Sequence, residues 1–341
     1  MIYRYPSYCD KFRCIADKCK DNCCIGWEID IDSDTLEYYK TVSGELGKRL
    51  DWNISDGSFV LAENERCPFL NERNLCDIIL ELGEEHICQI CTDHPRYYEW
   101  FGTVKEGGIG LCCEESARII LREDLALKEK EIPDEDCSDC DEELFRLLLS
   151  ARDIIIEHLQ KDEFPYSVCA MLDFADNLQF NIDNNDLTLP EYKRVTKSET
   201  PDIQKMLHFF TTLEPIDISW QPYIKRCTER LHDIPFMQKE HEPYLRRITT
   251  YFIFRYFMKG VFDGEILSRV KLAAVSTWII SYLWRCELLE KGSLDFEDMT
   301  QTAKFYSKEV EYSEENLDSL VDAFYTEVYF SSKQIMGAFD I

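Results

Sequence analysis

The feature that most constrains this sequence is a group of cysteines close to its start. Four thiols lie within eleven residues, at Cys14, Cys19, Cys23 and Cys24, and Trp27 follows them. Ordinary core packing does not require such a density of thiols, whereas zinc and iron–sulfur sites do, because thiolates are their preferred ligands. We therefore interpret the residues up to about 120 as the scaffold of a metal or cluster site.

The other cysteines extend this set, since thirteen of the sixteen precede residue 141. The N-terminus shows no apolar signal segment, so we expect a cytoplasmic protein, and in a reducing compartment grouped thiols favour metal ligation over disulfides. Ten thiols exceed one four-ligand site, so two sites, or one polynuclear site with spare cysteines, are expected. The predicted metal ligands are Cys14, Cys19, Cys23, Cys24, Cys67, Cys76, Cys88, Cys91, Cys112 and Cys113.

Several cysteines leave alternatives open. Cys23 and Cys24 are adjacent, so their side chains are expected to point apart and not to serve one metal equivalently. Cys113 precedes a predicted helix, whose amide dipoles favour a thiolate. The pair Cys137 and Cys140 lies in an acidic stretch, where it is either incidental in a mobile loop or an additional zinc clip. Three scattered cysteines are predicted to be buried apolar residues, namely Cys169, Cys227 and Cys286.

Charge narrows the class of partner. The formal net charge is −28, from 66 Asp and Glu against 38 Lys and Arg. Repulsion argues against nucleic acid or an anionic membrane as the partner and favours a cationic one, such as a lysine-bearing protein. A solvated acidic surface that aids solubility is the alternative. The longest apolar run, residues 272–284, is too short to span a bilayer and is predicted to be a buried helix.

Hydrophobic spacing predicts a mainly α protein in two parts. Residues 1–125 form a small cysteine-rich, metal-stapled domain, residues 126–143 an acidic linker, and residues 144–341 an all-α domain. The N-terminal domain is expected to contain short strands at 25–31 and 58–61, a hairpin over 67–76, helical segments at 35–40 and 77–82, and a helix after Cys113. Residues 44–57 are expected to form a helix end and a loop. In the second domain, helices are predicted at 144–160, 166–180, 202–213, 242–262, 266–289 and 313–330.

Two cofactor-binding motifs are excluded by spacing. A radical S-adenosylmethionine enzyme requires CxxxCxxC, but the third position of the run that starts at Cys19 is Gly26. The stretch Gly107-Gly108-Ile109-Gly110 lacks the third glycine of a dinucleotide-binding turn, and no βαβ pattern surrounds it.

Taken together, the motifs resemble the flagellin lysine-N-methylase (FliB-type) family. The order and spacing match over residues 9–121, whereas the helical remainder offers no motif. The family's proline after the last cysteine is Glu114 here, which leaves open whether Cys112 or Cys113 is the ligand. The first cysteine group is also similar to a broader set of zinc- or iron-chelating cysteine-cluster proteins. The stretches that carry the resemblance are Cys14-x4-Cys19-x3-Cys23-Cys24-x2-Trp27, Cys67-Pro-Phe-Leu-x5-Cys76, Cys88-x2-Cys91-x3-Pro95-Arg96 and Cys113-x-Glu115-x-Ala117-Arg118.

The resemblance implies transfer of a methyl group from S-adenosylmethionine to lysine side chains of flagellin, in a protein that holds zinc or an iron–sulfur cluster of the 4Fe–4S type. The lysine amine must be neutral to attack the methyl group, so the site must accept a proton or shelter the neutral amine. No electron transfer is required, which favours an organising role for the metal. A metal chelator without enzymatic activity and an iron–sulfur redox protein are the competing functions.

Candidate site residues lie close in sequence to the cysteines. Tyr97, Tyr98 and Glu115 are the predicted catalytic residues, and Arg96 is predicted to bind the carboxylate of the cofactor. For each of them, support of the neighbouring cysteines or simple exposure is the alternative. Further candidates for handling the amine are Asp93, His94 and Glu114.

Overall fold

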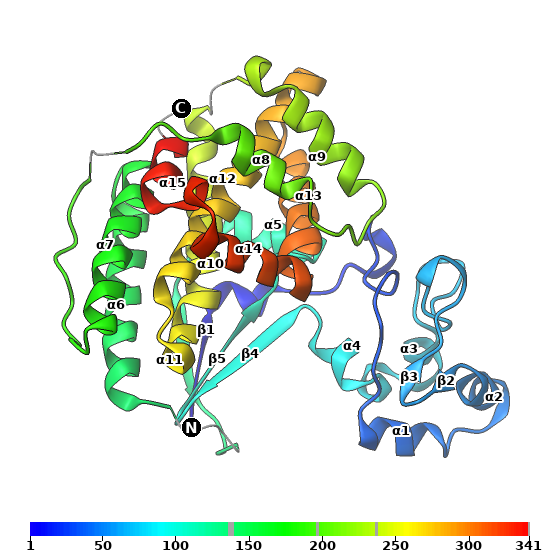
Figure 1. Cartoon of the computed structure of the whole chain (residues 1–341). Helices are drawn as coiled ribbons and strands as arrows, with labels where there is room; N and C mark the ends of the chain where they lie inside the picture. Colours follow the sequence, from blue (N-terminus) through cyan, green and yellow to red (C-terminus); the bar gives the residue numbers. More distant parts are fainter. Residues whose placement is uncertain (136–139, 196–197, 236–237, 340–341) are drawn as a thin grey trace.

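Helix α12 (Ile266–Lys291) is the element around which the fold is built (Figure 1). The structure, a computed structural model, describes residues 1–135, 140–195, 198–235 and 238–339. Because α12 is apolar on every face, most of its side chains up to Cys286 are buried, as the sequence predicted. Among the described residues it is the one helix long and apolar enough to cross a membrane, but 89% of its most apolar stretch is buried inside the protein.

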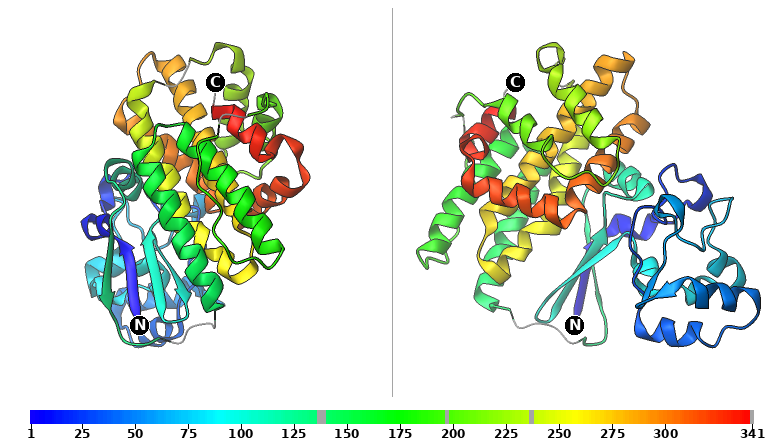
Figure 2. Two further views of the ribbon diagram at one scale, coloured as in Figure 1. Left: turned by 90° about the vertical axis from the view of Figure 1, so that its left-hand side faces the viewer. Right: turned by 45° about the vertical axis from the view of Figure 1, so that its right-hand side comes forward.

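Three helices pack along α12, namely α7 (Tyr166–Asp183), α10 (Glu242–Tyr256) and α13 (Phe296–Tyr306), and α6 (Glu142–Lys161) packs against α10 (Figure 2). Every helix predicted after residue 143 is present, whereas α9, α13 and α15 were not predicted. A capping box between Asp295 and Asp298 starts α13, and its buried face carries polar residues, which weakened the apolar pattern. The remaining helices of this body are α8 (Ile203–Phe210), α9 (Trp220–Glu229), α11 (Gly260–Asp263), α14 (Glu314–Thr326) and α15 (Ser332–Phe339).

A four-stranded sheet lies beneath the helices, with the order β4-β5-β1-β6. Strand β1 (Ile2–Pro6) pairs in parallel with β5 (Val104–Ile109) and antiparallel with β6 (Leu127–Glu131). Strand β4 (Arg96–Phe101) completes the sheet against β5. The sequence placed residues 127–131 in an acidic linker. They form a strand instead, because they pair along the whole of β1 and need no apolar face on this fully exposed edge.

The structure has two hydrophobic cores, and their division does not fall at residue 125. The larger core joins Tyr8, Phe101 and Ile109 to the helices, so the sheet and the helical body share one interior. Helix α5 (Glu114–Arg122), which follows β5, packs on α10 and α13 within the same core. The smaller core gathers residues between Ile29 and Cys88.

This smaller core belongs to a lobe that projects beside the sheet (Figure 1). The predicted helices at 35–40 and 77–82 are present. Residues 44–57, predicted as a helix end and a loop, contain a complete helix, α2. The predicted strand at 25–31 and the hairpin over 67–76 are reduced to isolated bridges, because the lobe holds its chain by single contacts between turns. Its elements are α1 (Ser33–Tyr39), α2 (Gly44–Trp52), β2 (Ile54–Ser55), β3 (Ser58–Phe59), α3 (Asp77–Leu82) and α4 (Gln89–Asp93).

Candidate functional site

Five of the predicted ligands gather on the core of the small lobe. Cys67 and Cys88 are buried in it, and Cys24, Cys76 and Cys91 pack against it half-buried. The backbone N–H of Cys67 donates to the carbonyl of Cys24 at 2.8 Å, and the Cys88 and Cys91 sulfurs lie 3.3 Å apart. The fold therefore brings together thiols that are separated by up to 67 positions in the sequence.

A second set of cysteines lies where the first segment of the chain meets the body. The Cys19 thiol lies 3.7 Å from Oε2 of Glu114, the first residue of α5. Cys113, the residue before α5, is near Cys23. Hydrogen bonding to the neighbouring Cys24 raises the pKa of Cys23, and interaction with His94 opposes that shift. The structure thus places Cys23 toward His94 and Cys24 toward the small core.

The remaining cysteines occupy three different environments. Cys14 is exposed, and Cys112 is fully buried beside the Tyr312 hydroxyl. Cys140 packs at the edge of the larger core near Gly102, while Cys137 lies outside the described residues. The predicted buried apolar positions Cys169, Cys227 and Cys286 are confirmed.

Thiolates are suitable metal ligands, but in this structure the cysteines of the described residues are not arranged as a complete ligand set. Nowhere in the described ranges do three or more His, Cys, Asp or Glu side chains converge closely enough to hold a metal ion. Burial raises the pKa of Cys67 to about 11 and that of Cys19 to about 12, so both thiols are protonated at neutral pH. Binding of a metal would have to release these protons. Metal stapling of the N-terminal part is therefore a proposal that the fold alone does not establish.

Ion pairs hold the first cysteine segment against the helical body. Asp21 contacts two buried lysines, Lys304 of α13 and Lys308 in the turn that follows it. The carboxylate of Glu114 accepts from the backbone N–H of Lys20 at 2.9 Å and from Arg118 at 3.0 Å. Buried charges require such partners, because desolvation of an unpaired charge is expensive. The segment is thus docked by the body as well as by the lobe.

A buried polar cluster lies beneath this segment, in the interior of the body. Arg255 of α10 is its centre, and its Nη1 lies 3.0 Å from Oε1 of Glu311. Three tyrosine hydroxyls complete the network, since Tyr251 and Tyr256 donate to Glu311 at 2.7 and 3.1 Å and Tyr312 accepts from Arg255 at 3.0 Å. The guanidinium also lies 4.4 Å from the ring centre of Tyr97. We call these six residues the Arg255 cluster.

The geometry of the Arg255 cluster depends on a wide helical turn. Residues Ser307–Glu311 form a π-helical turn directly after α13. Such turns are frequent at functional sites because they redirect side chains out of the regular helix pattern. Here the turn directs Lys308 toward Asp21, Glu309 toward the backbone N–H groups of Ile216 and Asp217, and Glu311 toward Arg255.

The structure separates the residues that the sequence grouped as catalytic. Tyr97 faces the Arg255 cluster, and burial raises its pKa well above 10, so its hydroxyl is protonated. Tyr98, the next residue of β4, faces the other side of the sheet, where it contacts Tyr3 and Lys105. Successive side chains of a strand point to opposite faces, so these two tyrosines cannot share a site.

Glu115 and Arg96 lie outside the Arg255 cluster, and Arg96 is near Tyr98, where its charge opposes the rise in the pKa of Tyr98 that burial causes. Glu115, in the first turn of α5, pairs with Arg118. Arg96 is exposed, lies over the Phe12 ring and donates to the carbonyl of Thr92 at 3.2 Å. Neither residue contacts the Arg255 cluster through any of its described interactions.

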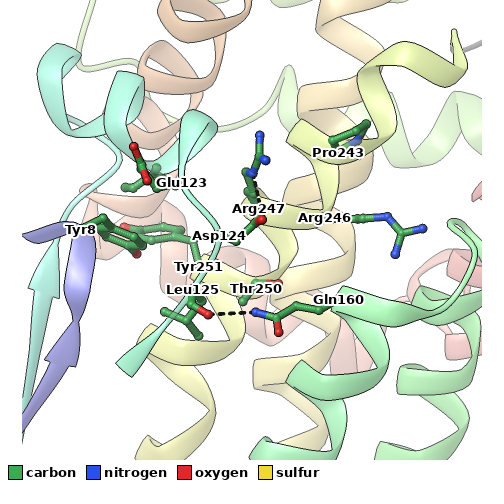
Figure 3. A pocket seen from close by; sticks show the side chains of 11 residues that line it. Tyr8, Glu123, Asp124, Leu125, Gln160, Pro243, Arg246, Arg247, Thr250 and Tyr251 are labelled. Carbon is green, nitrogen blue, oxygen red and sulfur yellow. Dashed lines mark hydrogen bonds and ion pairs between the residues drawn. The ribbon is translucent and has the colours of Figure 1, made fainter. Parts of the chain in front are cut away.

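A cavity of about 320 Å³ opens beside the Arg255 cluster (Figure 3). Tyr251 belongs to both, because it lines the cavity and its hydroxyl bonds to Glu311 and to the backbone N–H of Leu111. Tyr8 forms one wall, and Arg246 and Arg247 of α10 form another. This volume lies in the range of sites for small molecules, about 300–1,000 Å³.

Sequence reasoning missed Arg255, Glu311, Tyr251 and Tyr312. Arg255 and Tyr251 lie in a predicted helix that carried no motif, and Glu311 and Tyr312 lie between two predicted helices. One signal was available: Arg255 is the single charged residue in the run Tyr251-Phe-Ile-Phe-Arg-Tyr-Phe257. A charge in the middle of such an aromatic run must be buried and paired.

Comparison with known proteins identifies similarity in the helical half of the chain, where the sequence showed no motif. A family model described as the FliB lysine N-methylase C-terminal domain matches residues 152–337, which is more than half of the chain. A protein of Salmonella typhimurium named lysine-N-methylase is 27% identical over 139 residues, which cover 37% of this chain and 35% of that protein. The flagellar biosynthetic protein FliU of Salmonella muenchen is 26% identical over 140 residues, which cover 37% of this chain and 81% of FliU.

The similarity to the lysine-N-methylases covers only part of each chain. The chain spans about a third of the length of the lysine-N-methylases that it matches, including one from Salmonella choleraesuis at 27% identity, 37% of this chain and 35% of that protein. No solved structure matches the chain.

Proposed function

This chain belongs to the FliB lysine N-methylase family, and on that premise we propose that it is a cytoplasmic protein-lysine N-methyltransferase that uses S-adenosylmethionine and acts on flagellin. The observation that carries the proposal is the extent of the family match. Residues 152–337 include Arg246 and Tyr251 of the cavity wall and Arg255 and Glu311 of the buried cluster. The names of the relatives support lysine methylation and a link to flagella.

The proposed reaction is a direct displacement at the methyl carbon. The lysine nitrogen forms a bond to the methyl group as the sulfonium sulfur leaves with the electron pair, and one proton is lost from nitrogen. The protonated Tyr97 hydroxyl can orient an amine but cannot remove its proton at neutral pH, because burial raises its pKa well above 10. Glu115 is held by Arg118, so the site must receive the amine already neutral or release its proton to solvent.

We propose that the cysteines of the small lobe hold the metal, zinc or an iron–sulfur cluster. Five thiols on a core of only eleven buried residues fit that role, because so small a core does not stabilise a lobe by itself. A bound metal would link the turns at Cys24, Cys67, Cys76 and the Cys88–Cys91 pair. Methyl transfer to an amine moves no electrons to or from a metal, so the proposed contribution is structural.

The experiment that tests the proposed function is methyl transfer from labelled S-adenosylmethionine to purified flagellin, with protein prepared anaerobically and its metal content measured. Label on flagellin lysines, located by mass spectrometry, is the expected result. Absence of transfer from fully metal-loaded protein would instead favour a metal chelator or redox protein. Flagellin with its lysines acetylated is the control, because an acetylated amine is not nucleophilic.

A further inference from the structure

One charged side chain that lines the cavity beside the Arg255 cluster has no ion pair within the described residues. Its walls come from the turn Ser7–Lys11, the end of α5, the last turn of α6 and the first part of α10. Figure 3 shows Tyr8 and Glu123 at one end and Arg246 at the other. Glu123 is paired with Lys11 at 2.7 Å, so the uncompensated charge of the cavity lies at the Arg246 end.

This side chain is Arg246, whose guanidinium remains available to bind a ligand. Its one described hydrogen bond runs from Nη1 to the backbone carbonyl of Leu159, at 2.7 Å. None of the carboxylates in the described part of the chain forms an ion pair with it, although the sequence has 66 acidic residues against 38 basic ones. The neighbouring Arg247 differs, since it is paired with Asp124 at 2.8 Å. A guanidinium has five N–H donors in a planar fork, so Arg246 keeps enough of them for a carboxylate.

Two hydroxyls line the same cavity, those of Tyr8 and Thr250. Each residue is only 4% exposed, and within the described ranges neither hydroxyl has a hydrogen-bond partner. Neither hydroxyl is among the fully buried polar atoms without a partner, so both are open to the solvent in the cavity. Both hydroxyls are therefore placed to bond a polar ligand there.

We infer that this cavity binds the methyl donor, with Arg246 holding the α-carboxylate of its amino-acid group. The inference rests on the proposed function for the identity of the ligand, and on the unpaired guanidinium and the two hydroxyls for the place. Glu123 and Asp124 pair with Lys11 and Arg247, but each carboxylate keeps further acceptor positions that suit the hydroxyl groups of a nucleoside. Tyr251 connects this cavity to the Arg255 cluster, so a bound donor would lie next to Tyr97 and its neighbours.

The test compares two ligands that share the thioether nucleoside and differ in the amino-acid group, which carries the carboxylate that Arg246 would bind. S-adenosylhomocysteine carries the amino-acid group, whereas 5′-methylthioadenosine lacks it, and calorimetry gives the affinity of the metal-loaded chain for each. We expect S-adenosylhomocysteine to bind at least about tenfold more tightly, because hydrogen bonds to charged groups contribute about 1.5–3 kcal/mol. In Arg246→Gln this ratio should fall by about tenfold, while the affinity for 5′-methylthioadenosine is retained and serves as the check on folding.

Three further variants separate the alternatives. Arg246→Lys keeps the charge without the fork and should retain part of the ratio. Arg146→Gln, an exposed arginine of α6, should keep the full ratio, and so should Arg96→Gln, the arginine that the sequence proposed for this carboxylate. A ratio that survives in Arg246→Gln, or that is lost in Arg96→Gln, overturns the assignment, as does an equal loss of both ligands in Arg246→Gln.

The flagellin assay distinguishes failure of the site from failure of the proposed function. Methyl transfer by the native chain, with an unchanged ratio in Arg246→Gln, leaves the function standing and overturns the site. An Arg246-dependent ratio without transfer to any lysine supports the site and removes the proposed function. Failure of the native chain to bind either ligand overturns both.

Discussion

At the scale of single residues, burial decides what a polar side chain can do. Arg255 lies in the interior with Glu311 as its counter-ion, surrounded by tyrosines whose pKa values burial raises well above 10. Removing one partner of such a pair leaves an uncompensated charge and lowers stability by about 3–5 kcal/mol. The cluster is therefore a fixed part of the interior. Within the described part of the chain, Tyr97 is its one member whose hydroxyl has no hydrogen-bond partner.

Tyr97→Phe should show whether the Tyr97 hydroxyl contributes to stability or to methyl transfer. The Tyr97 hydroxyl is buried without a hydrogen-bond partner in the described residues, so its removal should leave the free energy of unfolding unchanged or raise it by up to about 1 kcal/mol. If that hydroxyl orients the amine, methyl transfer should fall about tenfold or more. Denaturant unfolding and the flagellin assay measure the two effects. Tyr98→Phe, on the opposite face of β4, is the matched comparison and should keep its activity. A loss of stability in Tyr97→Phe would show that the hydroxyl has a structural partner.

Glu309 should make stability depend on pH. Burial raises its pKa from 4.5 to about 7, and the N–H groups of Ile216 and Asp217 oppose that shift. Between these two pH values the folded state holds a proton that the unfolded state releases. The contribution of Glu309 is therefore fully present below pH 4.5 and is lost as the pH rises through about 7, by about 3 kcal/mol in total.

The test of this pH dependence is the difference between two unfolding curves. Glu309→Gln cannot ionise, so its stability relative to the native chain should rise as the pH goes from 5 to 8. Urea unfolding across that range measures the difference, and Glu142→Gln, at an exposed position, should show no such trend. Parallel curves for Glu309→Gln and the native chain would mean that Glu309 is ionised throughout.

At the scale of elements, strand β5 explains the glycine-rich stretch of residues 107–110, whose spacing does not match a dinucleotide-binding turn. Gly107 and Gly108 lie directly across from Tyr98 and Tyr97 of β4. A Cβ at Gly108 would overlap the Tyr97 ring, and a Cβ at Gly110 would overlap the Tyr312 hydroxyl. The glycines thus leave room for the tyrosines, which lie over the strand on both of its faces.

Gly110→Ala should disturb the Arg255 cluster through this contact. The added methyl group forces Tyr312 away, so we expect a loss of about 1–3 kcal/mol in unfolding free energy and a marked loss of methyl transfer. The same change in a Tyr312→Ala background should be nearly neutral, because the overlapping hydroxyl is gone. If Gly110→Ala still lowers the unfolding free energy by about 1–3 kcal/mol in the Tyr312→Ala background, the added methyl group clashes with a group other than the Tyr312 hydroxyl.

At the scale of the whole molecule, the two cores imply two levels of stability. The small core has eleven buried residues, whereas the large core extends from Tyr8 to Ala338. A lobe with so little apolar burial is expected to open locally unless a metal holds its turns together. The body needs no such support, because α12 and its neighbours bury a continuous interior.

Substitutions of the lobe cysteines should therefore act on the lobe alone. Cys67→Ala and Cys88→Ala should lower bound metal and lose hydrogen-exchange protection over residues 24–91, while protection of α10 and α12 is kept. Cys19→Ala and Cys23→Ala test the second predicted site, at the start of α5, and should lower bound metal if that site is occupied as the sequence predicts, whereas Cys227→Ala, in the large core, should not. Elemental analysis of the purified variants measures this, and equal metal content in all five would contradict the ligand assignment.

The sequence by itself determined the features that depend on local pattern. Apolar spacing located the long helices of the body, Ser313 marked the start of α14, and the cysteine motifs pointed to the family that the match over residues 152–337 supports. Such signals need only residues that are close along the chain. The same reasoning failed for β1, β5 and β6, because a strand in a small sheet is defined by partners about a hundred residues away.

Only the tertiary structure decided how the site is assembled. Proximity in sequence grouped Tyr97 with Tyr98, yet the alternation of β4 places them on opposite faces, one of them beside Arg255. The cysteines of residues 24–91 converge on one small core, while Cys19 and Cys113 meet at the start of α5. A charge such as Arg255 or Arg246 acquires its role from the groups that surround it after folding, and no local pattern records those groups.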